Sequence, residues 1–214
     1  MDAVCFDMDG VVVNSEDFWV PRETAELFPQ LVPDATVDVE EITGMNYRDI
    51  YDYLDETYDV HLHRDEFLAW YDDAAESIYG ADVHLLDGIQ QLVDTLREQG
   101  VAVGLVSSSP HHWIDIVLER FGLDFDEVVS ADAVDVPGKP APDIYEYAAD
   151  LLEVDPKSSV AVEDSGHGIE AAGAAGMHVV GFKHGDPDDT DRSAADYVAT
   201  TPADLREQLL SRSV

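Results

Sequence analysis

Four short, largely apolar runs separated by helical patterns restrict the fold of this 214-residue chain more than any other feature. The runs cover residues 3–6, 101–106, 160–162 and 178–182. Short continuous apolar runs predict strands that are buried on both faces, as in a parallel sheet. The first three runs end at a polar residue: Asp7, Ser107 and Glu163.

Apolar residues at helical spacing lie between and after these runs. They predict helices at about 89–99, 110–121, 142–152 and 201–209. Proline opens several of these stretches and glycine follows others, as expected at helix ends. Strands that alternate with helices predict an α/β fold with a Rossmann-like, doubly wound parallel sheet.

The stretch from about Ser15 to His84 lacks a convincing buried strand and is rich in aromatic and acidic residues. Residues 64–79 form an amphipathic pattern, and we interpret its aromatic stripe as core packing. The sequence therefore predicts an α/β core made of residues 1–14 and 85–214, with an α-helical cap inserted at residues 15–84.

The net charge is unusual for a globular chain. The chain has 11 Lys and Arg residues and 47 Asp and Glu residues, which gives a formal net charge of −36 at pH 7. Nucleic acids and anionic membranes are bound through basic residues, so both are excluded as partners. The sequence lacks an apolar run of roughly 18 residues and a basic, apolar leader, which predicts a cytoplasmic protein. A single cysteine, Cys5, excludes an intrachain disulfide.

The acidic residues are spread along the whole chain, and only three lysines remain. Like charges on such a surface repel one another over about 8 Å at 0.15 M salt but over only about 3 Å at 1 M, because salt screens them. The composition resembles that of proteins from salt-accumulating halophilic microbes, and we expect a halophilic source.

Polar residues follow the predicted strands or lie beside a helix start, where the ligand site of an open α/β sheet forms. They are Asp7, Asp9, Ser107, Lys139, Glu163 and Asp164. Carboxylates hold Mg²⁺, lysine and hydroxyl groups bind phosphate oxygens, and one carboxylate is free to attack phosphorus. This combination predicts phosphoryl transfer.

Four segments resemble, in order, the four motifs of the haloacid dehalogenase-like (HAD) superfamily. They are residues 6–12 (FDMDGVV), 106–109 (VSSS), 138–140 (GKP) and 162–165 (VEDS). The resemblance is closest to the branch that contains phosphoglycolate phosphatases and β-phosphoglucomutases, and it covers nearly the whole chain.

The resemblance implies a role for each catalytic candidate. Asp7 is expected to be the nucleophile that forms an aspartyl-phosphate, and Asp9 the general acid and base. Ser107 and the backbone N–H of Ser108 are expected to bind the phosphoryl group. Lys139 is expected to hold that group against Asp7.

The resemblance also implies a Mg²⁺ site and substrate contacts. The metal is expected on Asp7, the carbonyl of Asp9, Asp164 and Glu163, the last either directly or through water. Gly10 is expected to contact the substrate.

The segment 42–48 resembles the cap loop that reaches the active site. Within it, Arg48 is either a partner for a substrate carboxylate or second phosphate, or a surface arginine. Asn14 and Asp87 depart from the common pattern at the two cap hinges, which concerns hinge stiffness rather than chemistry.

The resemblance favours a phosphatase that acts on a small phosphorylated metabolite. Dehalogenases lack the second acid of the first motif, so Asp9 disfavours that activity. A phosphosugar mutase is a closer alternative, but Trp19 stands where such mutases carry a histidine, and the cap has no lysine. A catalytically silent protein that binds phosphate esters is a further alternative. We expect a monomer, although no feature of the sequence fixes the oligomeric state.

Two other patterns suggest different sites. Residues 166–171 fit the dinucleotide pattern G-x-G-x-x-A, but they directly follow two acids that would repel a pyrophosphate. The histidine pairs at positions 61 and 63 and at 111 and 112 lack a cysteine or a third histidine as a partner, and we interpret them as solvated.

Overall fold

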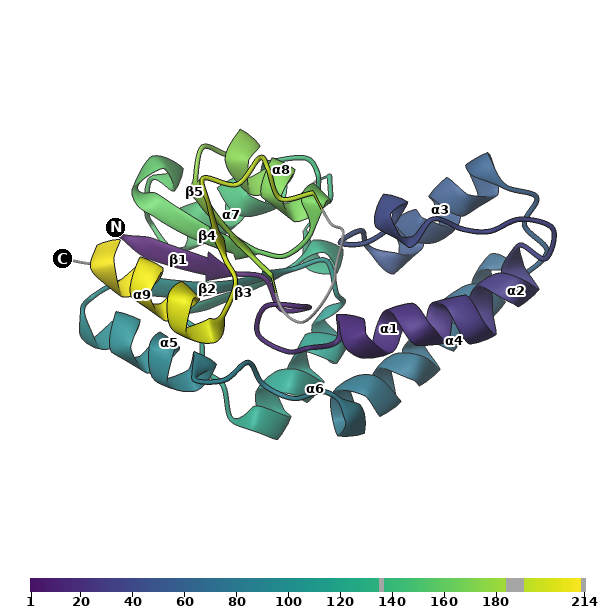
Figure 1. The fold of residues 1–214 in the computed structure, drawn as a ribbon, viewed down its shortest axis with the longest axis horizontal. Coiled ribbons are helices and arrows are strands. Elements are labelled where there is room, and N and C mark those ends of the chain that lie inside the picture. Colours follow the sequence, from purple (N-terminus) through teal and green to yellow (C-terminus); the bar gives the residue numbers. More distant parts are fainter. Residues whose placement is uncertain (135–136, 184–190, 213–214) are drawn as a thin grey trace.

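A parallel sheet runs through the centre of the larger lobe of the protein (Figure 1). The computed structural model describes residues 1–134, 137–183 and 191–212. Within them the strand order is β3-β2-β1-β4-β5-β6, so β1 lies between β2 and β4. The strands are β1 Ala3–Phe6, β2 Ala102–Ser107, β3 Glu127–Ser130, β4 Ser159–Glu163, β5 His178–Phe182 and β6 Tyr197–Ala199.

Helices cover both faces of this sheet, which confirms the predicted doubly wound α/β fold. They pack there because alternate residues of each strand point to opposite faces: Val4 and Phe6 belong to one core cluster and Cys5 to the other. The first face is covered by α5 Ile89–Glu98, α6 His111–Phe121 and α9 Pro202–Arg212, and the second by α7 Asp143–Leu151 and α8 Gly166–Ala174. Short 3₁₀ turns are η4 Ala131–Ala133 and η5 Pro156–Ser158.

All four predicted strands are present, but the apolar runs did not reveal β3 and β6. Both strands are short and lie at the two edges of the sheet. Glu127 and Tyr197, their first residues, are not fully buried. An edge strand need not be apolar on both faces, so the pattern that found the inner strands does not detect these two.

The smaller lobe consists of helices from residues 16–82 and lies beyond the carboxyl ends of the strands (Figure 1). Its elements are α1 Glu16–Arg22, η1 Glu23–Leu27, α2 Phe28–Leu31, η2 Val39–Glu41, α3 Tyr47–Thr57, α4 Arg64–Ser77 and η3 Ile78–Asp82. The two chain segments that connect the lobes run side by side: the N–H of Asn14 donates to the carbonyl of His84, and that of Leu86 to Val12. We call residues 15–84 the cap and the rest the core, the division that the sequence predicts.

The aromatic stripe of α4 is buried, as predicted for core packing: Phe67 is 0% exposed and Tyr71 3%. Tyr71 also lines a cavity between cap and core, so this side chain does more than fill space. Within the described residues, every helix is too short or too polar to span a lipid bilayer.

Candidate active site

The carboxyl ends of the three central strands bring the acidic motifs together. Asp7 directly follows β1, and its backbone N–H donates to the carbonyl of Val162 at 3.0 Å. Ser107 ends β2 and Glu163 ends β4, with Asp164 next in the chain. These strands are neighbours and parallel, so their ends meet at one edge of the sheet.

Lys139 connects the first and fourth motifs. Its Nζ lies 2.8 Å from Asp7 Oδ1 and 2.6 Å from Glu163 Oε1, and it also donates to the carbonyl of Val106 at 3.3 Å. The lysine and both carboxylates are buried, with Glu163 0% exposed. The hydroxyl of Tyr145 donates a further, short hydrogen bond to Glu163 Oε1. The buried charges are therefore held in direct contact with one another.

Burial and neighbouring charges shift the pKa values of Lys139 and Asp7. Burial alone lowers the pKa of Lys139, but the carboxylates of Asp7 and Glu163 outweigh it and raise that pKa above its usual range. Burial raises the pKa of Asp7 well above its usual range; Lys139 lowers it, and Glu163 raises it further. The ammonium is thus firmly protonated, and the crowded carboxylates favour a bound cation.

Three carboxylates in this cluster are close enough to share one metal ion. Ligand oxygens of Asp7, Glu163 and Asp164 all lie within 4.8 Å of one another. Burial raises the pKa of Asp164, and the carboxylates of Glu16 and Glu163 add to the effect. A set of oxygen ligands with this excess of negative charge fits a hard divalent cation such as Mg²⁺.

Two glycines make room for these carboxylates. A Cβ at Gly10, whose φ is +70°, would lie 1.8 Å from Asp164 Oδ2. A Cβ at Gly168 would lie 2.0 Å from the carboxylate of Glu163. Gly168 is the second glycine of the dinucleotide-like pattern, so its observed role is to admit a buried acid rather than a pyrophosphate.

Asp9 is held by hydroxyl groups from both lobes. Ser15 and Tyr79 each donate to its Oδ1 at 2.6 Å, and Ser109 donates to its Oδ2 at 2.8 Å. Trp19 in turn donates from Nε1 to the hydroxyl of Tyr79 at 3.1 Å. The orientation of this carboxylate is therefore fixed jointly by the core and the cap.

The serines of the second motif have different positions. Ser107 is fully buried, and its Oγ accepts the backbone N–H of Ser109 at 3.0 Å. Ser108 and Ser109 line the cavity. The sequence assigned the phosphate contact to Ser107 and Ser108; it did not single out Ser109, although this residue belongs to the same motif.

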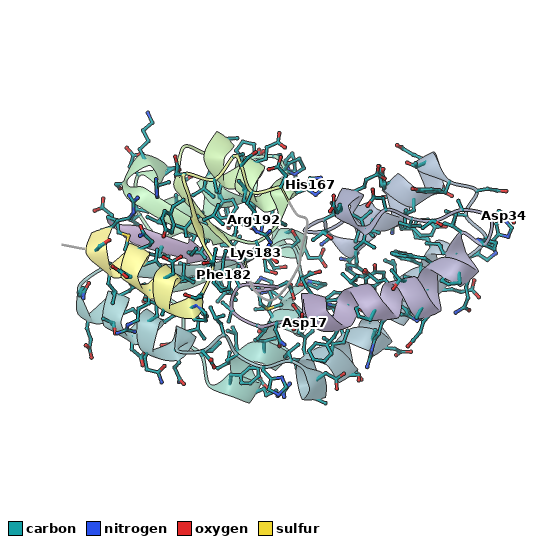
Figure 2. The ribbon with its side chains drawn as sticks, in the orientation of Figure 1. Asp17, Asp34, His167, Phe182, Lys183 and Arg192 are labelled. Carbon is teal, nitrogen blue, oxygen red and sulfur yellow. The ribbon has the colours of Figure 1, made fainter. Side chains whose placement is uncertain are left out.

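The cap loop closes onto the core at several points. Ser108 Oγ donates to the carbonyl of Gly44 at 2.8 Å, and Asn46 Nδ2 donates to the carbonyl of Ser108 at 2.8 Å. His167 lies on the side of the core that faces α3 (Figure 2), and its Nδ1 is 2.9 Å from the carbonyl of Thr43. These contacts partly bury the loop that the sequence predicts to reach the site.

Arg48, the last residue of this loop, pairs with an aspartate of the core. Its guanidinium forms an ion pair and short hydrogen bond with Asp132 of the core and lies 4.5 Å from the centre of the Tyr47 ring. Asn46 Nδ2 donates to the other oxygen of Asp132 at 2.9 Å. Arg48 is thus a link between cap and core in this structure and is not among the residues that line the cavity.

The cavity between the lobes has a volume of about 70 Å³. The core contributes four charged residues to its lining, Asp7, Asp9, Lys139 and Asp164. The cap contributes Glu16, Glu23 and most of the aromatic residues. The aromatic lining residues are Trp19, Tyr47, Tyr71, Tyr79 and Trp113. Ring centres of Trp19 and Trp113 are 5.6 Å apart, and those of Tyr47 and Trp113 are 4.8 Å apart.

Sequence reasoning did not identify several residues that take part in hydrogen bonds to acidic side chains of this site. They are Ser15, Glu23, Tyr71, Tyr79, Ser109 and Tyr145. Glu23, Tyr71 and Tyr79 lie on cap helices away from the four motifs, so only the fold brings them to the site. The histidine pairs predicted to be solvated do not join the metal cluster of the described residues; His61 and His112 lie near single aspartates.

Comparison with known proteins adds an independent view of the whole chain. A model of the haloacid dehalogenase-like hydrolase family matches residues 4–182. Hexitol phosphatase B of Escherichia coli (strain K12) is 33% identical over 184 residues, which cover 83% of this chain and 82% of that protein. Beta-phosphoglucomutase of Bacillus subtilis (strain 168) is 37% identical over 128 residues, covering 59% and 54% of the two chains. The crystal structure of beta-phosphoglucomutase from Clostridium difficile has the same fold, with a TM-score of 0.75 at 22% identity over 100% and 97% of the two chains.

Proposed function

Because the chain belongs to the haloacid dehalogenase-like hydrolases, we propose that it is a Mg²⁺-dependent phosphatase of small phosphomonoesters that works through an aspartyl-phosphate on Asp7. The observation that carries this proposal is the buried Lys139 Nζ, which touches Asp7 and Glu163 at the edge where Asp164 also lies. That arrangement offers a nucleophile, a phosphate-binding cation and a metal-binding cluster within one site.

The proposed reaction has two steps. In the first, Asp7 attacks phosphorus, an Oδ–P bond forms, and the ester oxygen leaves with a proton from Asp9. In the second, water attacks the phosphorus while Asp9 takes a proton from the water, the Oδ–P bond breaks, and inorganic phosphate departs as the Asp7 carboxylate is regenerated. The hydroxyls of Ser15, Tyr79 and Ser109 support this role because they fix the orientation of Asp9.

Lys139 and the metal have complementary parts in this scheme. Lys139 offsets the repulsion between Asp7 and an incoming phosphate dianion. Asp7, Asp164 and the carbonyl of Asp9 would hold Mg²⁺, which supplies positive charge against the phosphoryl oxygens. Glu163 already accepts hydrogen bonds from Lys139 and Tyr145, which favours its contact with the metal through water.

Hydrolysis is favoured over phosphosugar mutation by residues around Asp9. Trp19 stands at the position of the mutase histidine and donates a hydrogen bond to the hydroxyl of Tyr79. That hydroxyl in turn donates to Asp9, so Trp19 acts on Asp9 only through Tyr79. The cap supplies no lysine. The similarity to beta-phosphoglucomutase keeps mutation as a second candidate, and conversion of a hexose 1-phosphate to its 6-phosphate, without phosphate release, would establish it.

Phosphate release from a panel of phosphomonoesters, including p-nitrophenyl phosphate, tests the proposal. The parent and Asp7→Asn are measured with Mg²⁺ in molar KCl, with and without a chelator. We expect release by the parent that is lost in Asp7→Asn and on chelation. A folded parent that releases no phosphate from any ester would overturn the phosphatase assignment and favour the mutase or a silent binding protein.

We also propose that the protein is adapted to molar salt. The support is its charge of −36, with side-chain oxygens, drawn in red, that project outward from both lobes (Figure 2). We expect the helical circular dichroism to fall as KCl is reduced from molar to ~0.1 M, because the screening of like charges is lost. An unchanged signal would contradict the proposal.

A further inference from the structure

The cap contributes two carboxylates to the lining of the cavity, Glu16 and Glu23, and no cation among the described residues. Glu23, on η1, lines the cavity and is 7% exposed. The only cationic side chain among the described lining residues is Lys139, and it belongs to the opposite end, where it pairs with Asp7 and Glu163. Arg48, the nearby cap arginine, is paired with Asp132 instead.

Glu23 has a single fixed partner in the described part of the chain. The hydroxyl of Tyr71 donates to its Oε1 at 2.5 Å, and its Oε2 has no partner among these residues. The ring of Tyr71 continues into the aromatic wall, with its centre 5.3 Å from that of Trp19. A buried carboxylate with an open oxygen calls for a hydrogen-bond donor from whatever fills the cavity.

The chemistry of this wall discriminates between classes of leaving group. Hydroxyl groups of a sugar or polyol donate to a carboxylate, and their C–H faces pack against aromatic rings. A leaving group that carries a carboxylate or a second phosphate would instead bring a negative charge toward Glu23 without a cation to offset it. The cavity thus accepts one anionic group, the phosphoryl group that is transferred at Lys139.

We propose that Glu23 and Tyr71 form a specificity-determining pair, which binds the hydroxyls of a neutral, polyhydroxylated leaving group and rejects phosphate esters that carry a second anion. This inference rests on the proposed phosphatase function and narrows its substrates to sugar and polyol monophosphates.

The test compares kcat/KM at pH 8 with Mg²⁺ for sorbitol 6-phosphate, 2-phosphoglycolate and p-nitrophenyl phosphate. The variants are Glu23→Gln and Tyr71→Phe, and the matched control is Glu26→Gln, an exposed glutamate on the same turn of helix. In the parent we expect sorbitol 6-phosphate to be preferred over 2-phosphoglycolate by at least about 100-fold.

Each variant changes this preference in its own way. Glu23→Gln is expected to reduce it by about tenfold or more, by raising KM for sorbitol 6-phosphate and improving use of 2-phosphoglycolate. Tyr71→Phe is expected to raise KM for sorbitol 6-phosphate by several-fold, to about tenfold. Turnover of p-nitrophenyl phosphate, which lacks hydroxyls on its leaving group, is expected to change less than that of sorbitol 6-phosphate in both variants, and Glu26→Gln leaves all three rates unchanged.

Two results would overturn the inference: equal use of sorbitol 6-phosphate and 2-phosphoglycolate by the parent, or an unchanged preference in Glu23→Gln. The absence of hydrolysis of every ester would instead refute the phosphatase function. In that case calorimetric binding of the same esters to Asp7→Asn still decides the role of the pair, because equal affinities for both would exclude it.

Discussion

The core half and the cap half of the candidate active site differ in the partners that they give to buried charged side chains. In the core half, Lys139 lies between Asp7 and Glu163, so each charge has an opposite charge in contact. In the cap half, the buried Glu23 has a tyrosine hydroxyl as its partner and is surrounded by aromatic rings. Under the proposed function, this difference assigns the transferred phosphoryl group to paired charges and the leaving group to shape and hydrogen bonding.

The same difference appears in the pKa of each half. Burial raises the pKa of Glu23 to about 7, and the hydrogen bond from Tyr71 offsets only part of the effect. Lys139, although equally buried, has a raised pKa because its two carboxylates outweigh the cost of burial. Lys139 therefore stays protonated between its two carboxylates, whereas Glu23, which has no cation in contact, titrates near neutral pH.

Removal of the central cation is the strongest test of charge pairing in the core half. Lys139→Met leaves Asp7 and Glu163 as buried, unpaired carboxylates, so we expect the free energy of unfolding to fall by about 3–5 kcal/mol. We expect phosphate release to fall by about 10³-fold because the phosphoryl charge loses its partner. Urea unfolding and initial rates in molar KCl measure both. The exposed Lys157→Met is the control, and activity of Lys139→Met within tenfold of the parent would break the comparison.

Removal of the lone carboxylate should have the opposite effect on stability. The native-state pKa of Glu23, about 7, lies above its ordinary value of 4.5. The carboxylate therefore destabilises the fold increasingly as pH rises from 4.5 to 7, and fully above that range. We expect Glu23→Gln to gain up to about 3 kcal/mol at pH 8 and little at pH 4.5.

Urea unfolding of parent and variant at the two pH values provides the measurement. The exposed Glu26→Gln should change stability by no more than about 0.5 kcal/mol at either pH. A loss of stability at pH 8 in Glu23→Gln would mean that the cap carboxylate has a compensating cation, contrary to the difference described above.

Loss of the Tyr79 hydroxyl, which links the cap to Asp9 of the core, should have a smaller effect on activity and stability. Tyr79→Phe removes one of three donors to Asp9 and the acceptor for Trp19. We expect kcat to fall about tenfold with KM unchanged, and stability to fall by about 1–2 kcal/mol. Tyr51→Phe is a matched control, since its hydroxyl bonds to the carbonyl of Leu62 away from the site. Equal kcat losses in both variants would show that only stability is affected.

The smallest effect is expected at the ion pair between the lobes. Asp132→Asn weakens its pairing with Arg48, whose side chain is 39% exposed. An exposed pair contributes up to about 1 kcal/mol, so we expect KM to rise by no more than about fivefold. The rise should be larger in ~0.1 M than in 1 M KCl because salt screens the pair. Asp124→Asn, which breaks a remote pair with Arg97, should leave KM unchanged.

The inner strands and the core half of the site were predictable from local sequence. Apolar runs end at Asp7, Ser107 and Glu163, and parallel strands bring such ends to one edge. Lys139 was identified beside a helix start from its short motif. In each case, a few consecutive residues contain both the structural signal and the chemical group.

The cap half was not predictable in the same way. Glu23, Tyr71 and Tyr79 lie on separate elements between residues 23 and 82, and nothing in their immediate neighbours marks them as functional. Their hydrogen bonds to each other and to Asp9 join residues 48 and 70 positions apart.

The sequence by itself therefore determined the four inner strands of the sheet, the order of the motifs and the charged groups that are proposed to handle phosphate. Only the tertiary structure decided which cap residues face that site, that Arg48 turns to Asp132, and that Glu23 is left without a cation. The physical reason is that strand ends are placed by a local, repeating geometry, whereas the burial and pairing of a side chain depend on every element packed around it.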